Sequence, residues 1–163
     1  MNGIHPLIRR ILNNRGITDE DKILEILSDK PNRTYDPFLL KNMHAGVDLL
    51  LFSIKQNRRI CIYGDYDADD LIRGDGAELI ITVDCGSVSY DEVEYGKSIG
   101  IDFIITDHHN INERPADCIL INPKQPDCPY PFKHLAGCGV AFKLAQGIQR
   151  KTKLPRSILN GVL

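Results

Sequence analysis

The chain lacks long apolar runs. Its 163 residues contain no stretch of about 20 consecutive apolar residues, which a membrane-spanning helix needs. The first fourteen residues include two arginines and no small-residue cleavage site, so they do not resemble a secretory signal. Composition excludes wholesale disorder, because 42% of the residues are hydrophobic and 26% are charged. We therefore expect a folded intracellular protein, located in the cytoplasm.

The chain lacks paired cysteine motifs. The sequence has five cysteines, and no two of them have the CxxC spacing. An odd number without paired spacing favours free thiols in a reducing compartment. A zinc site is the weaker interpretation, because the spacing of the residues that could form it matches no common zinc pattern. Those residues are Cys118, Cys128, His134 and Cys138.

Net charge is also small, at −2, but its distribution is uneven. Residues 64–117 contain fourteen acidic residues against three basic ones, and residues 133–163 contain six basic residues and no acidic ones. An acidic centre beside a basic tail is typical of a protein that binds divalent cations and then meets a polyanion. Taken by itself, however, this uneven charge distribution is better explained by solvated faces and a basic helix end than by a binding function. The candidates for nucleic-acid binding are Lys143, Arg150, Lys151, Lys153 and Arg156.

Helical patterns come first in the chain, and short apolar runs follow. Thr18 is expected to cap one helix, and a second is expected from Asp36-Pro37 to Ile54. Four strands are predicted, at 59–63, 79–83, 102–106 and 118–121, with helices at 90–99 and about 140–149. The alternation predicts an α/β fold with a doubly wound, mainly parallel sheet and flanking helices. We expect a helical lead-in over residues 1–58 and the α/β domain over 59–163.

Acidic residues and histidines end three of the predicted strands. Ligands bind at the carboxyl ends of the strands in open parallel sheets, so we expect these side chains to converge. Carboxylates crowded in one crevice repel each other unless cations neutralise them, and oxygen ligands with imidazoles suit Mn²⁺ or Mg²⁺. Two such ions would form a phosphoryl-transfer site. For any single acid, a helix cap or an arginine pair is the stronger explanation, but not for the whole set. The set is Asp65, Asp67 and Asp69, then Asp84, then Asp107, His108 and His109.

The motifs at these strand ends resemble a known family. GDYDAD at 64–69, VDCG at 83–86 and DHH at 107–109 resemble the first three motifs of the DHH phosphoesterase superfamily. Residues 121–146 resemble a narrower group within it, the RecJ single-strand-specific DNA exonucleases, as do RGIT at 15–18 and DPFLLKNM at 36–43. The resemblance implies a hydrolase that degrades single-stranded DNA from 5′ to 3′ in repair and recombination, using two divalent metal ions, Mn²⁺ or Mg²⁺. It also implies a single-strand-binding protein and a helicase as partners.

The resemblance also implies a role for each strand-end residue. It makes Asp67 and Asp69 ligands of one ion each, Asp84 the bridging ligand and His108 a further ligand. His109 would contact the scissile phosphate or support the site, and Asp107 would orient the histidines. For Asp65 the resemblance leaves two roles open, as a metal ligand or as a residue that holds the turn.

The sequence departs from the family pattern after GDYDAD. Asp70 follows where the family has glycine and a helix start, and the helix, strand and second helix expected before VDCG are absent. The thirteen residues 66–78 are also too few for a well-covered parallel crossover. We expect that Asp69 and Asp70 are not neighbours in the natural protein, either because a segment was deleted or because the printed sequence joins across it. A chain break or a large separation should then mark this position.

The fourth acidic motif and the second domain of the family are not found before Leu163. We therefore expect an incomplete DHH domain over residues 59–163, in an N-terminal fragment that binds metal weakly and has little nuclease activity by itself. Two alternatives stay open. One is another DHH phosphohydrolase, acting on pyrophosphate, short oligonucleotides or cyclic dinucleotides, and the other is a catalytically silent scaffold. The Gly137-Cys-Gly139 helix entrance is equally consistent with phosphate binding and with tight packing.

Overall fold

A computed structural model describes residues 4–28, 34–64, 76–111 and 114–159, without the side chain of Arg156. The predicted ligands Asp65, Asp67 and Asp69, and the 69–70 junction, lie outside the described residues. The chain forms two compact units, Met1–Thr34 and Tyr35–Leu163. The helix that follows residue 42 belongs to the second unit, together with the sheet.

The first unit contains two short helices, α1 (Pro6–Asn14) and α2 (Glu20–Ile26). They are joined by a two-pronged ion pair in which the Arg9 guanidinium donates to both carboxylate oxygens of Glu20, at 2.5 and 2.8 Å. The expected cap of α2 was wrong by one residue. Asp19, not Thr18, is the N-cap, because its carboxylate accepts the backbone N–H of Lys22 at 2.8 Å.

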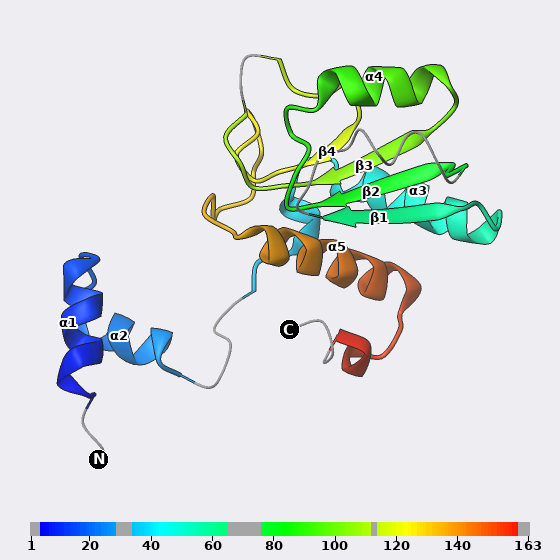
Figure 1. Cartoon of the computed structure of the whole chain (residues 1–163). Helices are drawn as coiled ribbons and strands as arrows, with labels where there is room; N and C mark the ends of the chain where they lie inside the picture. Colours follow the sequence, from blue (N-terminus) through cyan, green and yellow to red (C-terminus); the bar gives the residue numbers. More distant parts are fainter. Residues whose placement is uncertain (1–3, 29–33, 65–75, 112–113, 160–163) are drawn as a thin grey trace. The chain divides into compact units, whose positions relative to one another are not determined.

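The second unit is built on a four-stranded parallel sheet in the order β1-β2-β3-β4 (Figure 1). The strands are β1 (Ile60–Gly64), β2 (Leu79–Val83), β3 (Asp102–Thr106) and β4 (Ile119–Ile121). Their registers pair Gly64 with Val83, Val83 with Thr106, and Thr106 with Ile121. The last residues of all four strands therefore lie in one row, which confirms the parallel α/β fold predicted from the sequence.

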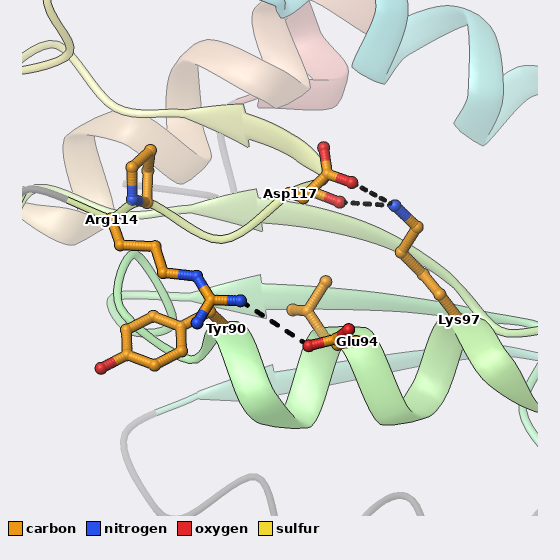
Figure 2. Close-up of a pocket in the computed structure, with 7 residues that line it drawn as sticks. Tyr90, Glu94, Lys97, Arg114 and Asp117 are labelled. Atoms are coloured by element: carbon orange, nitrogen blue, oxygen red, sulfur yellow. Dashed lines mark hydrogen bonds and ion pairs between the residues drawn. The ribbon is translucent and has the colours of Figure 1, made fainter.

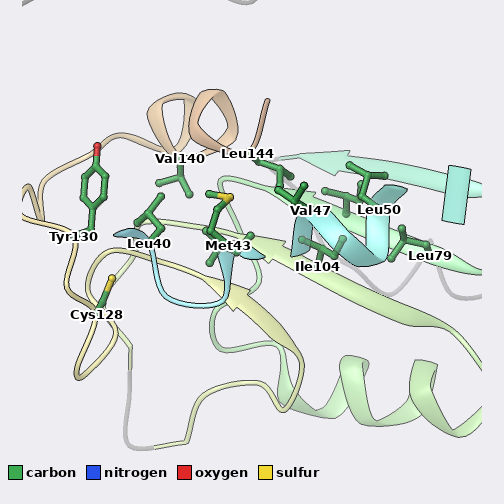
Figure 3. Packing of buried hydrophobic residues seen from close by; sticks show 12 residues of the cluster. Leu40, Met43, Val47, Leu50, Leu79, Ile104, Cys128, Tyr130, Val140 and Leu144 are labelled. Atoms are coloured by element: carbon green, nitrogen blue, oxygen red, sulfur yellow. The ribbon is translucent and has the colours of Figure 1, made fainter. Parts of the chain in front are cut away.

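Helices cover both faces of this sheet (Figure 1). Helices α3 (Met43–Lys55) and α5 (Gly137–Thr152) lie on one face, and α4 (Tyr90–Ser98) lies on the other. The alternation of side chains along each strand explains this arrangement. Leu79, Ile81 and Ile104 point toward α3 and α5, where they pack with residues such as Val47 and Val140 (Figure 3). Ile80, Phe103 and Ile105 form a second core with Val93 of α4.

The helix predicted from Asp36-Pro37 to Ile54 is interrupted. The chain forms a short 3-10 helix, η1 (Pro37–Leu39), whose first turn is capped by Asp36, and α3 begins only at Met43. Between them, Asn42 has a φ of 65°, in the left-handed region that ends a helix. Its side-chain amide donates to the carbonyl of Leu120 at 3.0 Å, which holds the break against β4.

The other elements lie close to their predicted bounds. Helix α4 ends before Gly100, which has a φ of 87°, and α5 is longer than expected because Gly137 already belongs to it. A last 3-10 helix, η3 (Arg156–Leu159), follows. Among the described residues, no helix has the length and hydropathy to cross a bilayer.

Candidate metal centre

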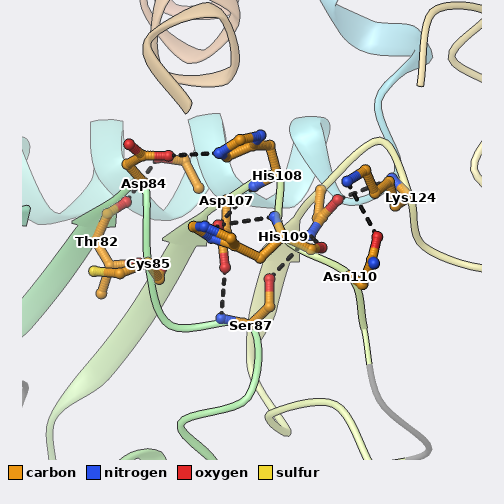
Figure 4. Close-up of polar contacts among 11 residues, drawn as sticks. Thr82, Asp84, Cys85, Ser87, Asp107, His108, His109, Asn110 and Lys124 are labelled. Atoms are coloured by element: carbon orange, nitrogen blue, oxygen red, sulfur yellow. Dashed lines mark hydrogen bonds and ion pairs between the residues drawn. The ribbon is translucent and has the colours of Figure 1, made fainter. Parts of the chain in front are cut away.

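Asp84 stands at the carboxyl end of β2, in an unusual backbone conformation. Its φ is 68°, which is uncommon for a residue with a side chain and is concentrated at functional turns. Its N–H donates to the carbonyl of Thr106 at 2.9 Å, so the ladder between β2 and β3 extends one residue beyond the strand. The Thr82 hydroxyl donates to the carbonyl of Cys85 at 2.7 Å and closes the turn. The Asp84 carboxylate is thus held at the row of strand ends (Figure 4).

Asp107 is the organising carboxylate at the end of β3. It is 1% exposed, and its own N–H donates to the carbonyl of Ile121 at 3.1 Å. One carboxylate oxygen accepts the N–H of Ser87 at 2.9 Å, and the other accepts the N–H groups of His108 and His109 at 2.6 and 3.2 Å. Burial would raise the pKa of Asp107, but the hydrogen bonds from Ser87 and His109 outweigh it and hold the pKa below its ordinary value. Asp107 is therefore a buried anion with its lone pairs occupied.

Asp107 also fixes the ring of His109. The Nδ1 atom of His109 lies 2.8 Å from Asp107 Oδ1 (Figure 4). A carboxylate accepts this bond, so Nδ1 carries the proton and Nε2 keeps its lone pair when the ring is neutral. This is the arrangement by which a carboxylate orients a histidine for binding a metal ion or for proton transfer. The side chain of His109 is 62% exposed and can meet a ligand from solvent.

The ring of His108 faces Asp84 rather than Asp107. Its Nε2 atom lies 3.0 Å from Asp84 Oδ1. That oxygen is buried, yet no donor makes a hydrogen bond to it with acceptable geometry. The two groups form an ion pair when the ring carries a proton on both nitrogens, and the two atoms are also close enough to share a cation. An unsatisfied carboxylate oxygen is costly in the interior, and a cation would satisfy it.

Asp84, His108 and His109 together form a possible cation site. One ligand atom from each of the three residues lies within 4.8 Å of the others. One carboxylate and two imidazoles suit Mn²⁺ and similar divalent ions. Among the described residues this is the one such cluster, so the alternative zinc group of Cys118, Cys128, His134 and Cys138 is not brought together.

Sequence reasoning missed two contributors to this site and left the role of a third open. Asn122, at the end of β4, is completely buried, and its side-chain amide donates to the Ser87 hydroxyl and to the carbonyl of His109, both at 2.9 Å. Ser87 links Asn122 to Asp107. A signal was available, because Asn122-Pro123 is the fourth strand end in the same row. The third contributor is Gly137, the first residue of α5, which contacts Asp84 and which no strand-end pattern could indicate.

The basic residues expected to bind nucleic acid do not form one free surface. Lys143 is 3% exposed, and its ammonium donates to the carbonyl of Tyr35 and to Oε1 of Gln146, both at 2.8 Å. Burial, together with nearby Arg150, lowers the pKa of Lys143. The prediction that Lys143 contacts nucleic acid therefore lacks support, because its side chain holds the start of the second unit to α5.

The remaining basic residues lie on the exposed side of α5 and beyond it. Arg150 pairs with Asp36 at 2.8 Å, and Lys151 pairs with Asp48 of α3. Lys153 is exposed, at the left-handed end of α5, and the side chain of Arg156 is not among those described. Surface ion pairs of this kind are weak, so Arg150 and Lys151 can exchange their partners for phosphate.

A separate cavity of about 310 Å³ lies on the α4 face of the sheet (Figure 2). It is lined by Tyr90, Glu94, Lys97, Arg114 and Asp117, among others. Its charges are already balanced, because Lys97 pairs with Asp117 at 2.8 Å and Arg114 lies 3.7 Å from Glu94 and over the ring of Tyr90. The cavity has no converging ligand atoms comparable to those at the strand ends.

Comparison with known proteins identifies relatives over most of the chain. The sequence is 36% identical over 184 residues to the single-stranded-DNA-specific exonuclease RecJ of Bacillus subtilis, covering 89% of this chain and 23% of that protein. It is 30% identical over 180 residues to RecJ of Escherichia coli, covering 85% and 30%. The chain thus spans between a fifth and a third of the length of these relatives. Both alignments are longer than the chain, so the relatives carry internal residues with no counterpart here.

Solved structures with the same fold were also found. A crystal structure of RecJ from Thermus thermophilus in complex with Mn²⁺ matches 88% of this chain and 25% of that chain, with a TM-score of 0.64 and 27% identity. A manganese-bound structure of exonuclease RecJ matches 71% and 39%, with a TM-score of 0.60 and 26% identity. The model of the DHH family N-terminal domain matches residues 10–163. Because the family model matches most of the chain, and because the VDCG and DHH motifs stand at adjacent strand ends, we conclude that the chain belongs to the DHH family.

Proposed function

We propose that this chain is the metal-binding part of a phosphodiesterase that removes nucleotides from the 5′ end of single-stranded DNA, in repair and recombination. The observation that carries the proposal is the cluster of Asp84, His108 and His109, in which a buried carboxylate oxygen has no hydrogen-bond donor. Support for the substrate comes from the relatives, which are named single-stranded-DNA-specific exonucleases. Support for the metal comes from related structures that contain manganese.

The residues fit a divalent ion. Asp84 Oδ1 and His108 Nε2 would hold it, and His109 offers a third ligand or a contact to phosphate. Asp65, Asp67 and Asp69 are the further ligands that we propose, and with them the site would hold two ions, Mn²⁺ or Mg²⁺. When bound, such ions polarise a phosphate and lower the pKa of water, which makes hydrolysis of a phosphodiester feasible.

The chain's own residues prepare this reaction. Asp107 holds His109 with Nδ1 protonated, so Nε2 faces outward and can accept a proton from water or contact a phosphate oxygen. Asn122 and Ser87 keep Asp107 and the backbone of His109 in place. Because these bonds are already made in the protein without substrate, little reorganisation is needed when DNA binds.

Single-stranded DNA would approach the site across surfaces that carry basic groups. We propose Lys153 and Arg156 as phosphate contacts, with Arg150 and Lys151 available if their ion pairs open. Binding through phosphates predicts an affinity that falls as salt rises. A single-strand-binding protein and a helicase remain proposed partners of the whole protein, and the cytoplasm its proposed location.

The proposal is tested by measuring Mn²⁺ binding to this chain through the electron paramagnetic resonance signal of the free ion. We expect the unmodified chain to bind Mn²⁺ and Asp84→Asn to bind at least about tenfold more weakly, since it loses a charged ligand. Asp117→Asn is the matched control, because this fully exposed carboxylate pairs with Lys97 away from the cluster. Equal affinity for Asp84→Asn and the unmodified chain would contradict the proposal.

The direction of digestion and the choice of substrate are tested by a nuclease activity assay. With Mn²⁺, a single-stranded oligonucleotide labelled at its 5′ end should lose the label as a mononucleotide before the chain shortens from the other end. Duplex DNA should persist. For this chain by itself we expect slow turnover at most. Hydrolysis of pyrophosphate or cyclic dinucleotides in preference to DNA would favour a different DHH phosphohydrolase, and no Mn²⁺ binding would favour a scaffold.

A further inference from the structure

We infer that Gly137 is a positioning residue for the metal site: the absence of a side chain at the start of α5 lets the Asp84 carboxylate point at His108. The inference rests on the proposed function, because the role of Asp84 as a ligand is part of it. It goes beyond that function by assigning a task to a residue that bears no ligand atom. It also answers a question left open by the sequence, namely what the glycines at the entrance of α5 are for.

The contact between Gly137 and Asp84 is very close. A Cβ atom placed on Gly137 would lie 1.9 Å from Asp84 Oδ1, 2.2 Å from Cγ and 2.6 Å from Cβ. All three distances are far below any real carbon contact. Rotating the carboxylate about its last bond cannot relieve the overlap, because the Cβ atom of Asp84 is itself too close. Turning the side chain about its Cα–Cβ bond moves the carboxylate but not Cβ, so one of the two backbones would also have to shift.

Neither backbone can move easily. Asp84 is held in its left-handed conformation by the bond from its N–H to Thr106, and Val83 before it is paired in register with the same residue. Helix α5 is anchored by Val140 and Leu144, which are buried against the sheet and α3. A methyl group at 137 is therefore accommodated only by rotation of the Asp84 carboxylate together with a forced shift of one backbone. That rotation would take Oδ1 away from its position 3.0 Å from His108 Nε2.

The position of α5 gives the carboxylate a second advantage. Gly137 is the first residue of a sixteen-residue helix, and its N-cap, Ala136, offers no side-chain hydrogen bond. The N-terminal end of a helix carries partial positive charge, which stabilises a nearby carboxylate. A glycine at the first position lets this end approach Asp84 more closely than any other residue would. The same contact therefore fixes the position of the carboxylate beside the start of α5.

Gly139 provides the matched control, since it lies in the same turn of the same helix. A Cβ atom there would have Leu135 Cδ2 as its nearest neighbour, at 3.2 Å, and this flexible side chain can give way. Gly139→Ala therefore adds the same methyl group and the same gain in helix propensity without touching Asp84. Any effect of Gly137→Ala that Gly139→Ala does not share comes from the contact with Asp84.

Two measurements on this chain test the inference. The first is Mn²⁺ affinity by electron paramagnetic resonance, where we expect Gly137→Ala to bind about tenfold more weakly and Gly139→Ala to match the unmodified chain. The second is thermal unfolding without Mn²⁺, measured as a double-mutant cycle of Gly137→Ala and Asp84→Gly. In this cycle Asp84→Gly removes the atoms that would clash with the new methyl group. Gly137→Ala should lower the melting temperature clearly when Asp84 is present, and by much less in the Asp84→Gly background.

The outcomes separate this inference from the proposed function. If the unmodified chain binds Mn²⁺ and Gly137→Ala binds it equally well, the inference is wrong and the proposed function stands. If the unmodified chain binds no Mn²⁺, the proposed function is wrong. The role of Gly137 in positioning a metal ligand is then wrong too, even if the melting temperatures show that the added methyl group clashes with Asp84. If Gly137→Ala does not fold, recovery of folding in the Asp84→Gly background supports the inference, and failure in both backgrounds overturns it.

Discussion

At the scale of single residues, the candidate site is organised by one buried carboxylate, that of Asp107, which is not part of the cluster of Asp84, His108 and His109. Asp107 receives N–H groups from the turns after both β2 and β3, and it orients the His109 ring. We therefore propose that the DHH motif contains two kinds of residue: a buried acceptor that organises the turn, and two histidines that would meet a ligand. Residues of the first kind are typically needed as much as the ligands they orient.

Asp107→Asn tests this division. The amide keeps the shape of the side chain but cannot accept hydrogen bonds at both of its ends, so the His109 ring loses its orientation. We expect Mn²⁺ affinity to fall about 10- to 100-fold, as for other residues that orient metal-binding histidines. The control is Asp102→Asn, which removes a carboxylate paired with Arg58 at the opposite end of β3. Unchanged Mn²⁺ binding by Asp107→Asn would show that His109 needs no support.

Two cysteines should differ strongly in their reaction with iodoacetamide. Burial raises the pKa of the Cys118 thiol to about 12, so almost none of it is thiolate between pH 7 and pH 9, whereas Cys138 is exposed. Mass spectrometry after brief alkylation at pH 8 should find Cys138 modified and Cys118 intact. Raising the pH toward 12, or unfolding the chain in urea, should make Cys118 react. Rapid modification of Cys118 in the folded chain at pH 8 would contradict its burial.

At the scale of elements, apolar runs and turn residues were enough to predict the four strands and α4. These strands are short and apolar, and each is followed by a polar turn, so the sequence pattern and the burial of the strands agree. The convergence of Asp84 with the DHH motif followed from the rule for strand ends, and the structure bears it out. Residues 65–75 are not described, so Asp65, Asp67 and Asp69 stay predictions.

Tertiary contacts explain what the pattern missed. The prediction missed the break at Asn42, because it extended the helical spacing of Met43, Val47 and Leu50 back to Asp36-Pro37. The interruption depends on a bond from Asn42 to Leu120, seventy-eight residues away. The approach of Gly137 to Asp84 likewise joins elements that are distant in sequence. Lys143 was assigned to the surface by its charge, and only the fold reveals its acceptors on Tyr35 and Gln146.

Replacing Asn42 tests the origin of the break before α3. Asn42→Ala loses the bond to Leu120 and places an alanine in the left-handed region, so we expect a loss of about 2 kcal/mol in the free energy of unfolding. Asn42→Gly loses only the side-chain bond, because glycine adopts this φ freely, and should cost less. Urea denaturation of both variants measures the difference. If Asn42→Gly is as damaging as Asn42→Ala, backbone conformation is not the cause.

At the scale of the whole molecule, the row of strand ends carries the proposed chemistry, and the helices on either face hold it in place. The internal residues of the relatives that this chain lacks agree with the sequence argument that 66–78 is short for a crossover. Among the described strands, β1 lies at the edge of the sheet and pairs only with β2. The sheet nevertheless keeps Asp84 and the DHH motif together, because both follow strands on the β2–β3 side.

Binding of DNA should distinguish surface lysines from the buried one. We expect Lys153→Ala to weaken binding of a single-stranded oligonucleotide and to reduce the slope of log affinity against log salt by about 0.7, the value for one phosphate contact. Lys143→Met should leave the slope unchanged, since its ammonium is buried and bonded to Tyr35 and Gln146. Fluorescence anisotropy across a salt series makes the comparison. If only Lys143→Met altered the slope, Lys143 and not Lys153 would be the residue that contacts a phosphate.

The proposed metal site requires that side chains from neighbouring strand ends share one divalent cation. Anomalous diffraction at the manganese absorption edge, from crystals of this chain grown with Mn²⁺, tests it most directly. We predict a peak in contact with both Asp84 Oδ1 and His108 Nε2. Manganese bound at other carboxylates, with no peak between these two atoms, would contradict the claim.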